Sequence, residues 1–249
     1  MYVSNYRRLT GALFITGAIL VNIPYALLVG HFDYPDVLRR PAEMILERFA
    51  AGGPDLIVQW LAFAWVGLPL LIAIALLPRA LERQESAAVS AGTVFGIVGG
   101  VVQMIGLLRW VFVVPMLARL YTDPGTSEAG RQAVAVTFQT LHQFGGVLLG
   151  EHLGQMFTIL WMGLISAELL RRPGRSAWLG WAGIAAALVY LAAQAELLAT
   201  VLPGMPEVPA AGLAGSLLWL GWMLWLGLSL LRQSADAAPR PVRLAGATR

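Results

Sequence analysis

Six stretches of about 20 or more predominantly apolar residues recur along the chain, each long enough to cross ~30 Å of hydrocarbon as a helix. They comprise residues 10–30, 54–78, 88–118, 144–170, 176–202 and 210–231. Hydrophobic residues make up 58% of the sequence and charged residues 12%, unlike soluble globular proteins. The pattern predicts an all-α integral membrane protein with a single six-span domain, residues 1–232. The polar, Ala- and Pro-rich residues 233–249 are expected to form a disordered cytoplasmic tail.

The distribution of arginine predicts the topology, because all 17 basic residues are arginine. With both termini inside, 11 of them face the inner side, five face the outer side, and Arg109 alone falls within a span. Since cytoplasmic loops of membrane proteins carry the excess of positive charge, both termini are expected in the cytoplasm. This asymmetry accounts for the net charge of +3 without a nucleic-acid partner. The sequence has no cysteine, which excludes disulfides, thiolate metal sites and cysteine nucleophiles.

Two segments on the predicted outer side are amphipathic and are expected to form interfacial helices. In residues 36–51, apolar side chains recur at helical spacing opposite charged ones, and a Gly-Gly pair then ends the helix. The apolar positions are Val37, Leu38, Met44, Ile45 and Phe49. The second segment starts at an N-cap, Ser127, and its apolar face contains Val134, Phe138 and Leu141. A straight helix over residues 128–170 would be about 65 Å long, so a bend is expected near Gly145.

These outer segments carry a resemblance to a known family. The stretch "FDYPDVLRRPAEMILERFAAGG" before a Trp-containing span, and the later "LHQFGGVLLGEHLG", resemble bacterial membrane proteins grouped as domain-of-unknown-function family 4386. The likeness covers roughly residues 5 to 232. It implies a multi-span protein of the bacterial plasma (inner) membrane, with the lipid bilayer as its surroundings. It implies no activity, cofactor or catalytic residue, so the site predictions come from the residues themselves.

Two glycine stripes at small-xxx-small spacing predict close helix packing. They consist of Gly92, Gly96 and Gly100 in the third span, and Gly146, Gly150 and Gly154 in the fourth. The first stripe lies in the inner half and the second in the outer half, so each is expected to need a different partner. That partner is either a helix of the same chain or, alternatively, a second copy in a homo-oligomer.

A layer of polar residues is expected in the outer half of the bundle. At 1.5 Å per residue, these residues reach about 30–36 Å from the predicted inner surface. The members are Gln59, Arg109, Glu151, His152, Gln194 and Glu196, with Gln155 as a further ligand-binding candidate. An unpaired charge in hydrocarbon costs ~3 kcal/mol or more. Arg109 and Glu151 are therefore expected within salt-bridge or one-water reach, with Glu196 or His152 in the same cluster.

Three functions fit such a layer. The first is an outer-facing pocket that binds a small amphiphile, lipid or ion, in a carrier, sensor or enzyme. The second is an interaction or regulatory subunit whose polar layer is purely structural or merely faces the headgroups. The third is haem or metal binding through His31, His142 or His152. His142 and His152 would lie about 15 Å apart on a straight helix, which weakens this alternative. No nucleotide loop or nucleophile elbow is present, which disfavours a primary pump or a conventional hydrolase.

Overall fold

The computed structural model describes residues 2–171, 175–208 and 210–236, and every regular element in these ranges is a helix. The helices are α1 (Tyr2–Leu20), α2 (Asn22–Phe32), η1 (Asp36–Arg39), α3 (Ala42–Trp65), α4 (Leu68–Leu81), α5 (Ala87–Phe112), α6 (Val114–Thr122), α7 (Glu128–Leu141), η2 (His142–Leu153), α8 (Gly154–Leu170), α9 (Arg175–Ala192), α10 (Gln194–Ala199) and α11 (Ala211–Asp236). The predicted all-α class is confirmed.

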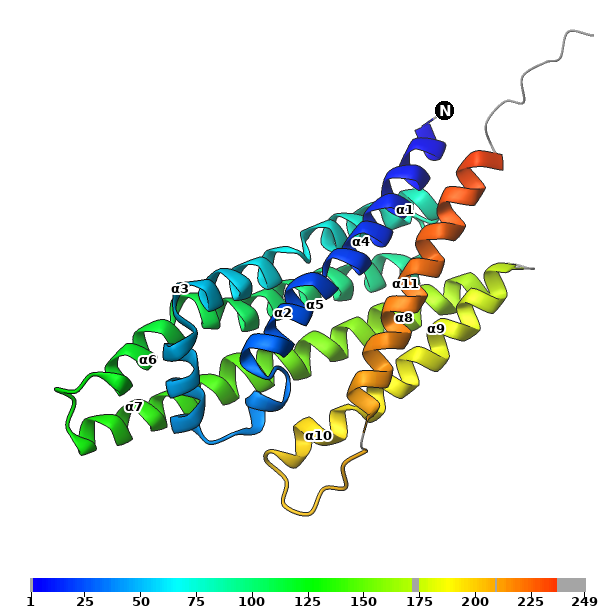
Figure 1. Cartoon of the computed structure of the whole chain (residues 1–249). Coiled ribbons are helices and arrows are strands. Elements are labelled where there is room, and N and C mark those ends of the chain that lie inside the picture. The colour runs from blue at the N-terminus through cyan, green and yellow to red at the C-terminus, as the bar shows by residue number, and fades with distance from the viewer. Residues whose placement is uncertain (1, 172–174, 209, 237–249) are drawn as a thin grey trace, which may run out of the picture.

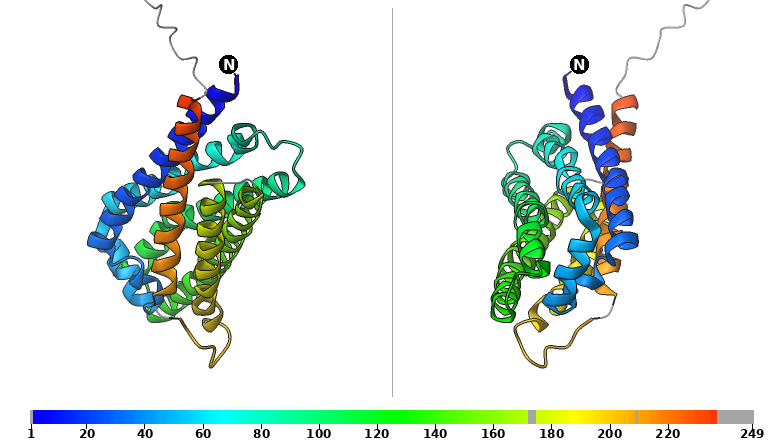
Figure 2. Two further views of the ribbon diagram at one scale, coloured as in Figure 1. Left: turned by 90° about the vertical axis from the view of Figure 1, so that its right-hand side faces the viewer. Right: turned by 60° about the vertical axis from the view of Figure 1, so that its left-hand side comes forward.

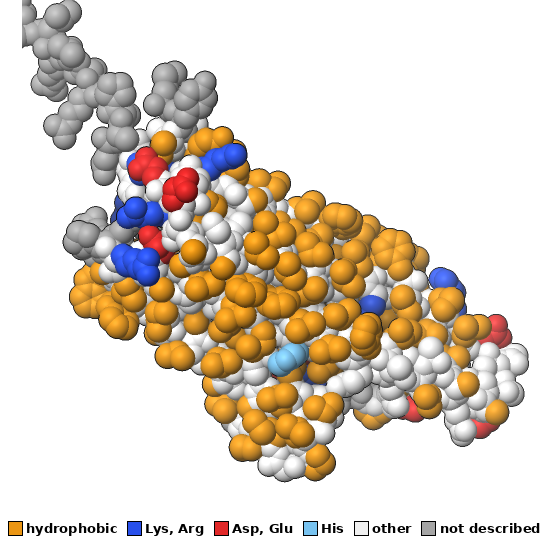
Figure 3. Space-filling view, turned by 180° about the vertical axis from the view of Figure 1, so that it is seen from behind, with side chains coloured by type: hydrophobic (Ala, Val, Ile, Leu, Met, Phe, Trp, Pro, Cys, Tyr) orange, Lys and Arg blue, Asp and Glu red, His pale blue; other side chains and the backbone are white. Residues whose placement is uncertain are grey.

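Consecutive helices join into long apolar runs. Within the described ranges, six runs are long and apolar enough to cross a membrane: Val3–Phe32, Ala42–Leu81, Ala87–Thr122, Glu128–Leu170, Ser176–Ala199 and Ala211–Ala235. Figure 3 shows hydrophobic side chains over the middle of the molecule and charged ones mainly towards its ends. The chain is therefore a multi-pass membrane protein. Helix α11 continues to Asp236, so the stretch expected to be a disordered tail begins as helix, and residues 237–249 lie outside the described part.

Six helices form a closed ring at one end of the molecule. There α1 packs against α4 and α11, α5 packs against α4 and α8, and α9 packs against α8 and α11. Helix α1 begins and α11 ends at this end of the molecule, which we call the terminal end (Figure 1). The opposite end, called the distal end, contains α2, η1, the start of α3, α6, α7 and α10 (Figures 1 and 2).

The bundle has two hydrophobic cores. One fills the ring, and its largest buried members include Phe14, Trp161 and Met223. The other lies in the distal half, between α2, α3, α6 and α7. In it, the rings of Trp60 and Trp110 stack with their centroids 4.8 Å apart. Stacked and edge-on aromatic pairs stabilise a core beyond their buried area, so this cluster holds the distal helices together.

The start of α3 confirms most of the first amphipathic helix. Residues 36–39 form a 3₁₀ turn, and Arg40 is extended because a residue before proline disfavours the α conformation. The helix then runs from Ala42 to a kink at Gly53, whose φ of +57° is readily adopted only by glycine. Of the predicted apolar face, Met44 points outward with 48% exposure. The other four members are buried: Val37, Leu38, Ile45 and Phe49.

The bend expected near Gly145 is wrong. The run from Glu128 to Leu170 stays helical, and residues 142–153 adopt the wider turns of a π-helix. Gly145 and Gly146 carry no side chain, and the Arg109 side chain lies against both of them, with its guanidinium at Gly146. A π-helical section thus replaces a break, as often occurs at functional sites. The predicted N-cap is confirmed, since the Ser127 hydroxyl accepts a hydrogen bond from an N–H of α7.

As expected, the two glycine stripes do not press against each other, and each meets other residues. Helix α5 runs antiparallel to η2 and α8, and each stripe mostly faces large side chains of the opposite helix. Gly92 faces Leu164, Gly96 faces Trp161, Gly146 faces Arg109 and Gly154 faces Gln103, while Gly100 faces Leu71 of α4. Gly150 instead meets Gly106 back to back. These contacts cover the stripes within one chain.

Candidate functional site

The centre of the polar layer is an arginine that bridges two carboxylates. Arg39 Nη2 lies 2.7 Å from Glu151 Oε2 and 3.2 Å from Glu196 Oε1. The side chains are 32%, 21% and 48% exposed, respectively, so the cluster is partly buried rather than fully solvated. Burial lowers the pKa of Arg39, but the two carboxylates raise it more, so it remains a cation. Glu151 and Glu196 share one cluster, as predicted.

In the described part of the chain, Arg109 makes no direct salt bridge with Glu151, because Arg39 pairs with Glu151 instead. That Arg109 and Glu151 lie within one-water reach stays a prediction. The Arg109 guanidinium packs over the Trp110 ring, 5.0 Å from its centroid, and donates to the carbonyl of Gly106. Glu151 still lies within electrostatic range of Arg109. The pairing of Glu151 with Arg39 was not predicted, because side chains were ranked by height along straight helices, whereas η1 folds back onto the bundle.

His142 connects Arg109 to η1. Its Nε2 lies 3.0 Å from the carbonyl oxygen of Leu38, and its Nδ1 lies 3.4 Å from Arg109 Nη2. A carbonyl oxygen can only accept, so Nε2 carries the proton and Nδ1 accepts from the arginine. His142 is therefore a neutral imidazole with both nitrogens engaged.

A second hydrogen-bonded group lies beside the first. His152 Nδ1 lies 2.8 Å from Gln194 Oε1, and Gln194 Nε2 donates to Gln155 Oε1 at 2.6 Å. Gln194 is only 5% exposed. His152 follows Glu151 in sequence and Gln194 precedes Glu196 by two positions, so the two groups form one polar layer. The structure thus brings together five of the predicted candidates: Glu151, His152, Gln155, Gln194 and Glu196.

His31 and Gln59 form a separate pair. His31 Nδ1 lies 3.1 Å from Gln59 Oε1, joining α2 to α3, and His31 is exposed. The structure does not bring the three histidines together. In the part of the chain that the structure describes, no three His, Asp or Glu side chains are grouped for a metal ion.

Two buried atoms of the polar layer have unused hydrogen-bonding capacity. Among the described residues, Glu151 Oε1 and Arg109 Nε have no hydrogen-bond partner. Tyr34 also lies within electrostatic range of Glu151, and burial, together with that carboxylate, raises the pKa of its phenol. The phenol therefore remains a neutral hydroxyl that is able to donate.

Sequence reasoning missed Arg39 and Tyr34. Arg39 was grouped with the arginines of the outer surface, since it follows a span and precedes an amphipathic segment. The signal was the apolar pair immediately before it: Val37 and Leu38 are 1% and 8% exposed and anchor η1 to the bundle. An arginine next to such an anchor is held close to the helices beneath it.

The terminal end has its own buried carboxylate, Glu168, which the sequence analysis did not single out. Its side chain is 4% exposed and lies 3.0 Å from Arg83 Nε and 3.5 Å from Arg171 Nη1. Ser86, the N-cap of α5, donates to it at 2.8 Å. Because every one of these partners is local to the α4–α5 loop and the end of α8, we interpret Glu168 as a structural link.

The fold and the site define a class: a helical membrane protein with six membrane-spanning runs in its described part and an Arg–Glu–His polar layer at the distal end. The chain belongs to the family described as "Domain of unknown function (DUF4386)", whose model matches residues 9–227. This confirms the resemblance seen in the sequence. No curated protein and no solved structure matches the chain.

Proposed function

We propose that the protein binds a small polar ligand, or the polar head of a small amphiphile, in the distal polar layer. The observation that carries the proposal is the unused pair of buried atoms, Glu151 Oε1 and Arg109 Nε. Leaving a buried polar atom unpaired costs about 1–3 kcal/mol, and more for a charged group. A ligand that both donates and accepts, such as a hydroxyl or an amide, would supply the acidic oxygen with a donor and the guanidinium with an acceptor.

The surroundings of these atoms support a ligand rather than a metal ion. Arg39 already neutralises Glu151 on its other oxygen, and Arg109 is a second positive charge nearby. The Tyr34 hydroxyl adds a neutral hydrogen-bonding group close to Glu151. The Glu151 side chain is 21% exposed, so the carboxylate lies close to solvent although its Oε1 is buried. This environment favours a neutral or weakly acidic head over a cation.

The test is to identify what co-purifies in mild detergent, by native mass spectrometry with an absorption spectrum for haem. Wild-type protein should retain a molecule that Glu151→Gln loses while remaining folded. The matched control is Glu128→Gln, at an exposed position in the first turn of α7. The proposal is wrong if wild type and Glu151→Gln carry the same molecules, or none, and the substitution only lowers stability.

For the membrane and orientation, we propose the bacterial plasma membrane with both termini in the cytoplasm. The 11-to-5 distribution of arginine supports this orientation, because positive residues favour the cytoplasmic side. The distal polar layer would then face the outer leaflet.

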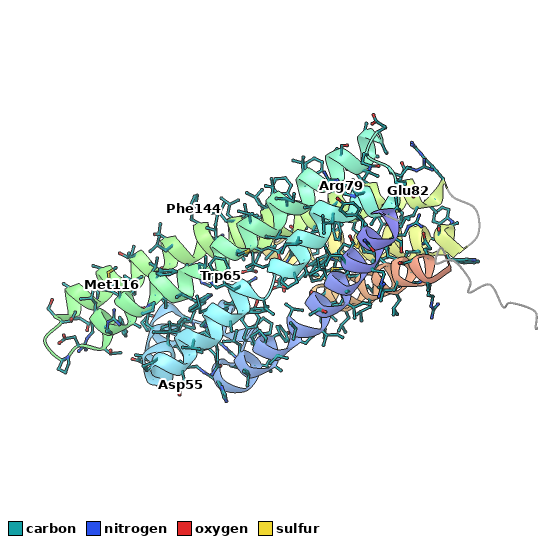
Figure 4. The ribbon with its side chains drawn as sticks, turned by 90° about the horizontal axis from the view of Figure 1, so that it is seen from above. Asp55, Trp65, Arg79, Glu82, Met116 and Phe144 are labelled. Carbon is teal, nitrogen blue, oxygen red and sulfur yellow. The ribbon has the colours of Figure 1, made fainter. Side chains whose placement is uncertain are left out.

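A second candidate function is that of an interaction subunit, and one surface favours it. Phe112, Met116 and Leu120, spaced four residues apart across α5 and α6, are 73%, 51% and 47% exposed. Figure 4 shows Phe144 and Met116 along the same side of the bundle, with Phe144 near the middle and Met116 closer to the distal end. Site-directed cross-linking from position 116 in native membranes tests it: a defined protein adduct supports a partner, and lipid adducts alone exclude one.

A further inference from the structure

A cleft of about 430 Å³ opens at the distal end, and the polar layer described above does not account for it. It lies between the start of α3, the junction of α7 with η2, and the end of α10. Its volume falls within the range of small-molecule sites. The apolar part of its wall is the exposed Val201, with the buried Ile45 and Phe138 beneath, so the cleft can hold an apolar chain as well as a polar head.

The charge of the cleft determines which ligand head group it favours. Among the described lining residues, Arg40 is the only charged one. Its guanidinium has no ion-pair or hydrogen-bond partner in the described part of the chain, in contrast to Arg39, which holds two carboxylates. Extended backbone between η1 and α3 places Arg40 at the rim. A free guanidinium without a competing carboxylate favours an anion.

The neighbouring polar groups offer amide N–H donors to such an anion. Gln143 Nε2 donates one proton to Thr200 Oγ1 at 3.0 Å, which leaves its second N–H free. The Thr200 hydroxyl itself donates to the carbonyl of Leu197. Gln139, exposed on α7, adds another amide at the edge of the cleft.

We infer that this cleft binds an oxyanion head, a carboxylate or a phosphate, carried on an apolar chain. The head pairs with Arg40 and the Gln143 amide, and the chain lies against Val201, which is 59% exposed. The site is distinct from the Glu151 layer and meets it through His142, which lines the cleft and accepts from Arg109. The inference does not depend on a ligand at Glu151.

The test measures binding of decanoate to the purified full-length protein in a neutral detergent at neutral pH, by titration calorimetry against protein-free micelles. Decanol, acetate and inorganic phosphate are titrated in parallel. Arg40→Gln removes the charge, and Gln139→Trp fills the cleft from an exposed position. The matched control is Arg119→Gln, an exposed arginine on α6 outside the cleft.

We expect decanoate to bind wild type and Arg119→Gln equally, and to bind Arg40→Gln about tenfold or more weakly, the loss typical of a charge-assisted hydrogen bond. Gln139→Trp should also weaken it. Acetate or phosphate could instead bind as strongly as decanoate and lose binding in Arg40→Gln. That result would support the oxyanion site, with a free anion rather than a lipid-like molecule as its ligand. Equal binding of decanol and decanoate, unchanged binding in Arg40→Gln, or no binding of any probe would overturn the inference.

Discussion

Arg39 and Glu151, 112 residues apart in sequence, form the shortest ion pair between described residues, with Arg39 Nη2 2.7 Å from Glu151 Oε2. The contact ties a short turn between two spans to the π-helical section of the fourth span. Arg39 also holds Glu196 on α10, so three segments meet at one guanidinium. Since Gln194 in the same helix binds His152, α10 is attached to η2 at two points.

We predict that Arg39→Gln lowers the free energy of unfolding by about 1–3 kcal/mol, because it leaves the partly buried Glu151 carboxylate without its counter-charge. Thermal unfolding in detergent measures the loss. In the double variant Arg39→Gln/Glu151→Gln, much of it should be recovered, since neither charge is then unpaired. Arg40→Gln, one residue along, serves as the control and should leave stability unchanged. Equal stability of wild type and Arg39→Gln would contradict the bridging role.

We predict that Gly106→Ala destabilises the protein by about 1–3 kcal/mol through overpacking. A Cβ at position 106 would lie 2.6 Å from the Cα of Gly150, and backbone cannot move aside without separating α5 from η2. Gly163→Ala on α8 is the matched control, because a Cβ there meets nothing within 4 Å. That control should be neutral or slightly stabilising, since alanine favours the helix. The measurement is the unfolding temperature of both variants. Equal unfolding temperatures would contradict the close contact between Gly106 and Gly150.

A reporter active only in the cytoplasm, fused after Arg249, should be active. The reason is the excess of arginine on the side of both termini, which holds that side in the cytoplasm. A periplasmic reporter at the same position provides the complementary readout and should be silent. The reverse pattern would invert the orientation and place the distal polar layer at the inner leaflet.

Hydropathy and helical periodicity were enough to predict the spans and most of the buried amphipathic faces, because both depend on local sequence. Phe138, for example, is 2% exposed, as expected from its spacing. The position of Arg39 could not be predicted, because it depends on how a proline-flanked turn folds back across space. The π-helix was likewise hidden, since nothing local distinguishes wide turns from a Gly-Gly break. The polar layer was found only where its members lie within the predicted spans, as Glu151 and Gln194 do.

Arg109 separates a ligand-binding role of the layer from a structural one. Its guanidinium has no directly paired carboxylate in the described part of the chain, and its Nε has no partner. An apolar side chain at position 109 loses the hydrogen bonds to Gly106 and His142, but it also removes the cost of burying a charge that has no directly paired carboxylate, and the two effects offset each other. We therefore predict that Arg109→Met changes the free energy of unfolding by no more than about 1 kcal/mol, yet abolishes retention of the co-purifying ligand. Thermal unfolding and native mass spectrometry on the same preparation give both readouts. If Arg109 instead only braces His142 and η1, the variant should unfold at a clearly lower temperature while its bound molecules stay those of the wild type.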